Sequence, residues 1–108
     1  MEPGLFGSEA RTRVLLAIYL LNETYASELA QLLGRSVSRI QAAVESFELV
    51  GVVTTRVFGN TRMISLNPQF FAAAELRQLL QKLGLQDVAL QQMLAAKRRR
   101  PRRIKKEL

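Results

Sequence analysis

The 108-residue chain contains no cysteine and no histidine, and this limits the chemistry that its side chains can perform. A disulfide, a thiolate or imidazole metal site and a thiol-based redox sensor are therefore excluded. The nine acidic residues are scattered without a paired motif, and the chain has no glycine-rich phosphate loop. We therefore expect no enzyme activity, no cofactor and no metal ion.

The residues whose types and spacing favour recognition chemistry lie in one short stretch. They supply hydroxyl, guanidinium, amide, methyl and carboxylate groups, and they are Ser36, Ser38, Arg39, Gln41, Ala42 and Glu45. In the major groove of DNA, glutamine recognises adenine, arginine recognises guanine, a methyl group contacts thymine and a carboxylate accepts from cytosine. Each residue alone could equally belong to an ordinary exposed helix face. As a group they favour base contact if the stretch is the recognition helix of a helix-turn-helix, and Ser36 with the helix amides could hold a phosphate.

Four residues outside this stretch could contact the DNA backbone from a turn and a hairpin, namely Arg35, Arg56, Asn60 and Arg62. Phosphate contacts of this kind are sensitive to salt and largely independent of base sequence. The alternative is that these are ordinary surface residues. Two features count against strong binding, because Ala42 adds no charge and the Glu45 carboxylate repels phosphates unless it accepts from a cytosine amine.

The net charge of +7 comes entirely from the C-terminal end of the chain. Residues 97–108 contain eight of the 16 basic side chains and one of the nine acidic ones, so residues 1–96 are electrically neutral. We expect this basic end to be disordered when unbound, because it has almost nothing to bury. Its predicted role is non-specific nucleic-acid contact through Arg98, Arg99, Arg100, Arg102, Arg103, Lys105 and Lys106. The alternative is a solubilising or localising segment, or an anchor for another polyanion.

Helical periodicity predicts three helices in the first half of the chain. Ser8 is a candidate N-cap of the first helix, which is apolar on more than one side and is therefore either a central core helix or also part of a subunit interface. A polar break at residues 22–24 precedes a short second helix that ends at Gly34. Ser36 then caps the third helix, residues 37–50, whose buried side is predicted to be Val37, Ile40, Val44 and Phe47. The short turn around Gly34 has the length and chemistry of a helix-turn-helix.

A hairpin and further helices are predicted after the third helix. Residues 52–66 contain two strand-like segments around Phe58-Gly59-Asn60, which predicts a β-hairpin. Asn67-Pro68 has the chemistry of a helix start, and the leucine pattern of residues 69–97 predicts one helix or, if Gly84 interrupts it, two. The predicted divisions are an entry segment (1–7), a winged helix-turn-helix domain (8–67), a C-terminal helical segment for dimerisation (68–97) and a basic disordered tail (98–108).

The stretch from Leu5 to Leu83 resembles the small bacterial winged-helix regulators of the ArsR/MarR-like type. The resemblance lies in LFGSEARTRVLLAIYLL, YASELAQLLGRSVSRIQAAVESFELVGVV and TTRVFGNTRMISLNP, which are similar to the first helix, the helix-turn-helix and the wing of that group. It implies a mainly α fold with a small β-hairpin, in which C-terminal helices follow a winged helix-turn-helix. It also implies a transcription regulator that binds DNA with its recognition helix, residues 37–50, in the major groove and its wing, residues 52–66, on the backbone or in the minor groove.

Such a regulator is predicted to bind double-stranded DNA as a homodimer. The apolar surplus of the helices predicts an interface of Leu15, Tyr19, Leu76, Leu79, Leu80 and Leu83. The alternative is a protein-interaction winged helix that acts as a scaffold, with its basic tail docked on an acidic partner or RNA. The longest apolar run, residues 14–21, is shorter than the about 20 residues that span a bilayer, so we expect no membrane association. The expected location is the bacterial cytoplasm, and the nucleoid when the protein is bound to DNA.

Overall fold

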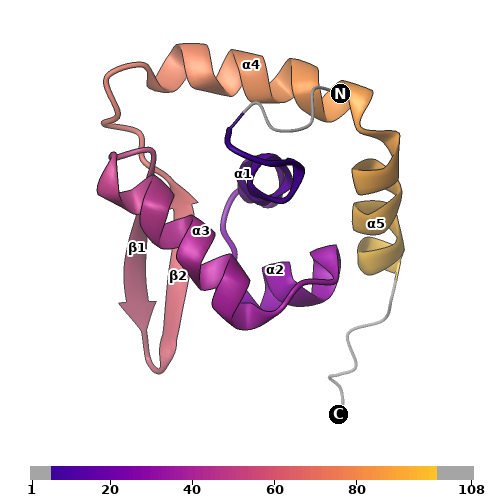
Figure 1. Cartoon of the computed structure of the whole chain (residues 1–108), viewed down its shortest axis with the longest axis horizontal. Helices are drawn as coiled ribbons and strands as arrows, with labels where there is room; N and C mark the ends of the chain where they lie inside the picture. Colours follow the sequence, from indigo (N-terminus) through magenta and orange to yellow (C-terminus); the bar gives the residue numbers. More distant parts are fainter. Residues whose placement is uncertain (1–5, 100–108) are drawn as a thin grey trace.

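The computed structural model describes residues 6–99, which form five helices and one two-stranded antiparallel hairpin. Figure 1 shows α1 end-on in the centre, with α4 above it, α5 and α2 on two other sides, and α3 with the hairpin on the remaining side. The mainly α class with a small β-hairpin is therefore confirmed. The elements are α1 (Glu9–Leu21), α2 (Ala26–Leu33), α3 (Val37–Leu49), β1 (Val53–Phe58), β2 (Thr61–Leu66), α4 (Ala73–Gln86) and α5 (Val88–Arg99).

The central helix α1 is apolar on several sides because other elements surround it. Ser8 begins the helix as predicted, and its Oγ accepts a hydrogen bond from the Arg11 backbone N–H at 3.1 Å. Five consecutive residues, 14–18, are buried, and they contact α2, α3, α4 and β2 across the core. Of the two interpretations of α1, the central core helix accounts for its apolar pattern within the single chain.

This packing corrects half of the predicted dimer interface. Leu15 is 1% exposed, Leu80 is 0% exposed and Leu83 is 7% exposed in the single chain. These three side chains fill the core between α1 and α4, so they are not available to a second subunit. Tyr19 and Leu76 are half-buried at the edge of the core, and Leu79 is 40% exposed.

The turn between α2 and α3 follows its predicted chemistry. Gly34 ends α2 in the left-handed conformation, with φ +67°, and the Arg35 N–H returns to the Ala30 carbonyl at 3.0 Å. Ser36 begins α3, where its Oγ accepts from the Arg39 N–H at 3.2 Å. One prediction here was wrong, because Val37 lies in the first turn of α3 with 41% of its surface exposed. Ile40 is instead the first residue of α3 whose side chain is buried in the core.

The hairpin forms where it was predicted, but Phe58, which was predicted in the turn, ends β1 and leaves a two-residue turn. Strands β1 and β2 pair from Val53↔Leu66 to Phe58↔Thr61, with Gly59 and Asn60 between them. A third segment joins this sheet, because Thr24 exchanges two backbone hydrogen bonds with Ile64, at 3.0 and 2.7 Å. Thr24 lies in the polar break that precedes α2, and its side chain is fully buried. The wing is therefore attached to the helix-turn-helix by backbone as well as by side chains.

The predicted helix start at Asn67-Pro68 was wrong. The Asn67 side chain is used elsewhere, since its Nδ2 donates to the Gly51 carbonyl at 3.0 Å and its Oδ1 accepts from the Gln69 N–H at 3.0 Å. These bonds close the base of the hairpin and form a turn, and helix α4 begins only at Ala73.

The C-terminal segment forms two helices, and the break between them lies at Asp87. Gly84 is inside α4, near its C-terminal end. Helix α5 continues to Arg99, so Arg98 and Arg99, which were predicted as tail residues, belong to that helix. The predicted tail residues Arg100, Arg102, Arg103, Lys105 and Lys106 lie outside the described residues, as do residues 1–5. Within the described part, no helix has the length and apolarity that a membrane crossing requires.

Candidate nucleic-acid interface

Helix α3 buries one side and exposes the other. Its buried side is formed by Ile40, Ala43, Val44 and Phe47, which pack into the core. The six predicted base-contacting positions are all exposed, and they are Ser36, Ser38, Arg39, Gln41, Ala42 and Glu45. The fold therefore places all six on the exposed surface of α3 and its N-cap, where no other described element covers them.

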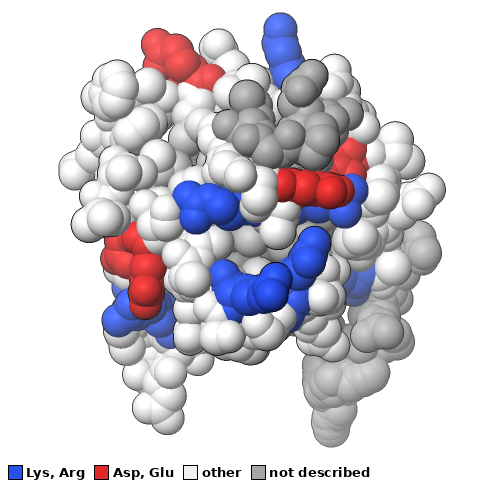
Figure 2. Space-filling model, viewed as in Figure 1, with Lys and Arg blue, Asp and Glu red and all other residues white. Residues whose placement is uncertain are grey.

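The two edges of this surface differ in charge. At 100° per residue, Arg39 lies on the edge of α3 that faces α1, whereas Gln41 and Glu48 lie on the edge that faces the wing. A groove runs along each edge, one toward α1 and one toward the hairpin. Figure 2 shows basic side chains gathered in the middle of this face of the molecule, over the region that α1 and α3 occupy in Figure 1.

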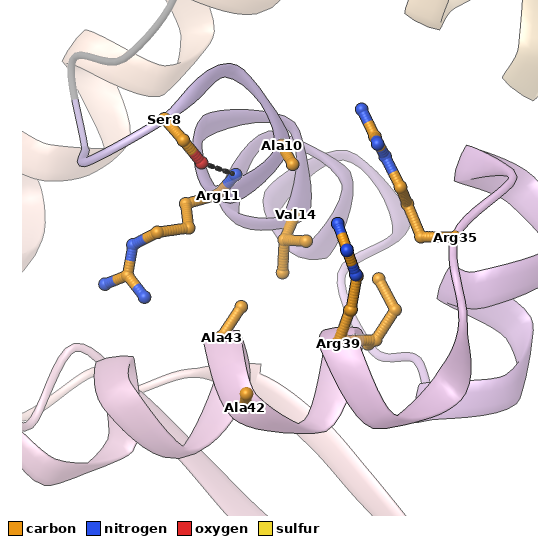
Figure 3. Close-up of a pocket in the computed structure, with 9 residues that line it drawn as sticks. Ser8, Ala10, Arg11, Val14, Arg35, Arg39, Ala42 and Ala43 are labelled. Carbon is orange, nitrogen blue, oxygen red and sulfur yellow. Dashed lines mark hydrogen bonds between the residues drawn. The ribbon is translucent and has the colours of Figure 1, made fainter.

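The groove between α1 and α3, which we call the α1–α3 groove, has a volume of about 310 Å³. Its floor is made of small and apolar side chains, among them Ala10, Val14 and Ala43. Arg35 and Arg39 extend side by side toward α1 along one wall (Figure 3). Neither guanidinium has a carboxylate within 4.0 Å among the described residues.

A third arginine borders this groove but is held by other contacts. The Arg11 Nε donates to the Phe6 carbonyl at 3.0 Å, and its Nη2 donates to the Ser46 Oγ at 2.7 Å. Its guanidinium also lies over the Phe47 ring, 4.9 Å from the centroid. Arg11 therefore joins α1 to α3, and in Figure 3 its side chain extends away from Arg35 and Arg39.

The groove between α3 and the hairpin, which we call the wing groove, has a volume of about 210 Å³ and is partly acidic. Glu45, Glu48 and Arg62 line it above a floor that includes Val44 and Ile64. The Glu48 carboxylate accepts from the Thr55 Oγ1 at 2.9 Å, while Glu45 is exposed. Two carboxylates therefore line the wing groove together with one guanidinium, that of Arg62.

The predicted wing residues are exposed, but one of them is already paired. The Arg56 Nη2 lies 3.3 Å from the Glu23 Oε2, and its guanidinium stacks over the Phe58 ring at 4.9 Å. Asn60 lies in the turn at the tip of the hairpin, and Arg62 is exposed on β2. Of the two wing arginines, only Arg62 lacks a carboxylate partner among the described residues.

Sequence reasoning missed two ion pairs that attach the C-terminal helices to the winged helix. Asp87 is 4% exposed and accepts two hydrogen bonds from Arg13, at 2.9 and 3.1 Å. The Lys97 Nζ lies 2.9 Å from the Glu28 Oε2, and the Glu28 Oε1 accepts from the Thr24 Oγ1 at 2.6 Å. The aspartate that precedes an apolar helical run could have indicated a cap at Asp87. Nothing in the local sequence indicated the partner of Lys97.

Solved structures of winged-helix regulators share this fold. Lactococcus lactis ZitR superposes with a TM-score of 0.62 at 13% identity, covering 90% of this chain and 66% of ZitR. MarR from E. coli gives 0.59 at 19% identity over 83% of this chain and 65% of MarR. MepR, named as a transcription regulator of the Staphylococcus aureus multidrug efflux pump MepA, gives 0.56 at 14% identity over 82% of this chain and 73% of MepR. The fold is that of the MarR-like winged-helix regulators, as the sequence resemblance predicted.

The similarity to these proteins lies in the fold rather than in the sequence. No protein-family model and no curated protein matches the chain. The chain spans slightly less than two thirds of the length of ZitR and MarR.

Proposed function

We propose that this protein is a transcription regulator that binds double-stranded DNA with sequence preference. In this proposal α3 enters the major groove, and the hairpin of residues 52–66 lies on the backbone or in the minor groove. The regulators that share the fold support this assignment, since their names describe repressors and transcription regulators. A binding role also suits a chain that has no histidine or cysteine for catalysis or metal binding.

The observation that carries the proposal is the exposed face of α3. Helices normally bury one side and expose a charged one, but the six predicted positions on this face are two serines, a glutamine, an alanine, one arginine and one glutamate, with exposed Val37 and Leu49 beside them. Ser38, Ala42 and Glu45 lie along its middle, where an α-helix in the major groove meets base edges. Gln41 lies beside them and can make a bidentate contact to adenine.

The experiment that tests the proposal is selection of bound duplexes from a random DNA pool, at stated salt, by the full-length protein. The wild type should enrich a defined sequence. In Gln41→Ala the discrimination at one base pair should fall by about 1–3 kcal/mol, and the preferences at the other base pairs should be unchanged. Gln78→Ala, which removes an exposed glutamine from α4, should leave the enriched sequence unchanged. Enrichment of no sequence by the wild type would contradict the proposal.

We further propose that the protein acts as a homodimer, which places two copies of α3 about one helical turn of DNA apart. Of the six residues first predicted for the interface, Tyr19, Leu76 and Leu79 retain exposed surface. Leu79→Glu should therefore yield monomers in sedimentation, and Gln78→Glu, the neighbouring exposed position, should not. A Leu79→Glu protein that remains a dimer would remove α4 from the proposed interface.

A scaffold function remains the second candidate, and the wing groove favours it. Glu45 and Glu48 present carboxylates next to the wing, where a DNA-binding protein would gain from positive charge. In this alternative the exposed face of α3 contacts a protein, and the basic C-terminal end docks on an acidic partner or RNA. The alternative is supported if the folded part alone binds no DNA of any sequence.

A further inference from the structure

Two guanidinium groups that have no carboxylate within 4.0 Å among residues 6–99 set the α1–α3 groove apart from the rest of the folded surface near α3. We propose that this groove holds the sugar–phosphate backbone of the bound DNA, with Arg35 and Arg39 on the phosphates. The inference rests on the proposed DNA-binding function and adds to it the place where the folded part contacts the backbone. It assigns the stronger backbone contact of the folded part to the α1 side of α3 and the weaker one to the wing.

The distribution of ion pairs identifies which arginines are available. Arg11 is held by Phe6, Ser46 and Phe47, Arg13 by Asp87, and Arg56 by Glu23 and Phe58. Arg35 lies in the turn before α3 and Arg39 in the first turn of that helix, and both exposed side chains line the same groove. A phosphate placed between them gains two charge-assisted contacts without first breaking an ion pair.

The shape of the groove also suits a nucleic-acid backbone. The side chains beneath the two arginines are short, and Ala10, Ala42 and Ala43 leave an open channel of about 310 Å³ (Figure 3). Such a volume admits more than a single phosphate group, and the apolar floor can pack against the carbon face of a deoxyribose. Because the groove borders α3 on one edge, a strand lying in it keeps the middle of the α3 face directed at base edges.

The wing offers a weaker backbone site by the same criteria. The Glu23 carboxylate beside the Arg56 guanidinium offsets part of its charge and would repel a phosphate placed there. Arg62 has no carboxylate partner within 4.0 Å among the described residues, but it shares the wing groove with Glu45 and Glu48. The assignment also changes the role of Arg39, which binds backbone rather than guanine and so contributes affinity without sequence preference.

The test measures salt dependence with the full-length protein and two duplexes, the one enriched by selection and a scrambled version. Each phosphate contact contributes about 0.9 to the slope of log K against log salt. The double variant Arg35→Gln with Arg39→Gln should therefore lower the slope by about 1.8 on both duplexes. A charge-matched control, Arg77→Gln with Lys82→Gln, removes two exposed basic side chains from α4 and should leave the slope unchanged.

A second variant changes the shape of the groove and leaves its charge unchanged. Ala10→Leu fills the groove from α1 without altering any charge or any residue on the α3 face. It should weaken binding to both duplexes several-fold, whereas Ala74→Leu, on an exposed position of α4, should not. Circular dichroism and the melting temperature verify that each variant is folded.

Several outcomes would overturn the inference. An unchanged slope in the arginine double variant, or wild-type affinity in Ala10→Leu, would place the backbone elsewhere. If the arginine double variant lost affinity only for the selected duplex, Arg39 would be a base-contacting residue. In these cases the proposed DNA-binding function stands, whereas a wild-type protein that binds neither duplex would overturn the function and the groove assignment together.

Discussion

The Asp87 carboxylate holds three helices in place. Its Oδ1 accepts from the Leu90 N–H at 3.1 Å and so caps α5, and both of its oxygens accept from Arg13 on α1. The residue is 4% exposed, and it lies where α4 ends. A buried carboxylate that loses its cationic partner is strongly destabilised, so this pair fixes the corner between α4 and α5 against the central helix.

Two substitutions at Asp87 separate its roles. Asp87→Asn keeps an oxygen that can cap α5 but removes the charge, and we expect it to lower the free energy of unfolding by about 1–3 kcal/mol, since Arg13 retains some solvent contact. Asp87→Ala also removes the cap and should cost about 1 kcal/mol more. Urea unfolding at constant m-value measures both changes. Wild-type stability in Asp87→Asn would mean that the cap, and not the ion pair, holds the corner.

For the candidate site, the sequence predicts which side chains are exposed but not which arginines are paired. Exposure of the six α3 positions could be predicted from helical periodicity, because the buried positions on the same helix define the opposite side. Which arginines form ion pairs could not be predicted, since Glu23 lies 33 positions from Arg56 in the sequence and Asp87 lies 74 positions from Arg13. Only the fold shows which charges are neutralised and which are free.

Among the secondary-structure elements, the helix caps that depend only on nearby residues were predicted correctly. The caps at Ser8, Gly34 and Ser36 depend on backbone groups three to five residues away, and all three are found in the structure. Elements that depend on distant partners were missed. Asn67 bonds to Gly51 across the base of the hairpin rather than capping a helix, and Thr24 pairs with Ile64 of β2.

One substitution made at two glycines should have opposite effects on stability. Gly34→Ala places a Cβ at φ +67°, and although the site has open space we expect a loss of about 1–2 kcal/mol from backbone strain alone. Gly84→Ala lies inside α4, where the new Cβ would sit 3.7 Å from the Leu20 side chain in ordinary contact, and a gain of about 0.5–1 kcal/mol is expected. Thermal unfolding of both variants measures the signs. Stabilisation by Gly34→Ala would contradict the strained turn.

In the molecule as a whole, the net charge is concentrated at one end of the chain. Residues 1–96 have no net charge, and their free arginines near α3 lie beside the α1–α3 groove and on the wing. The +7 excess belongs to residues 97–108, although Lys97 is paired with Glu28 in the structure. We therefore assign sequence preference to the folded part and much of the non-specific affinity to the basic end.

Truncation after Arg99 tests this division and leaves α5 intact, together with the Lys97–Glu28 pair. The removed segment carries Arg100, Arg102, Arg103, Lys105 and Lys106, so up to five phosphate contacts are lost and the salt slope should fall by up to about 4.5. The preference for the selected duplex over a scrambled one should survive, because the face of α3 that is proposed to contact bases is unchanged. Complete loss of DNA binding by the truncated protein, with an unchanged circular dichroism spectrum, would favour the scaffold function, since the folded part would then have no affinity for DNA of its own.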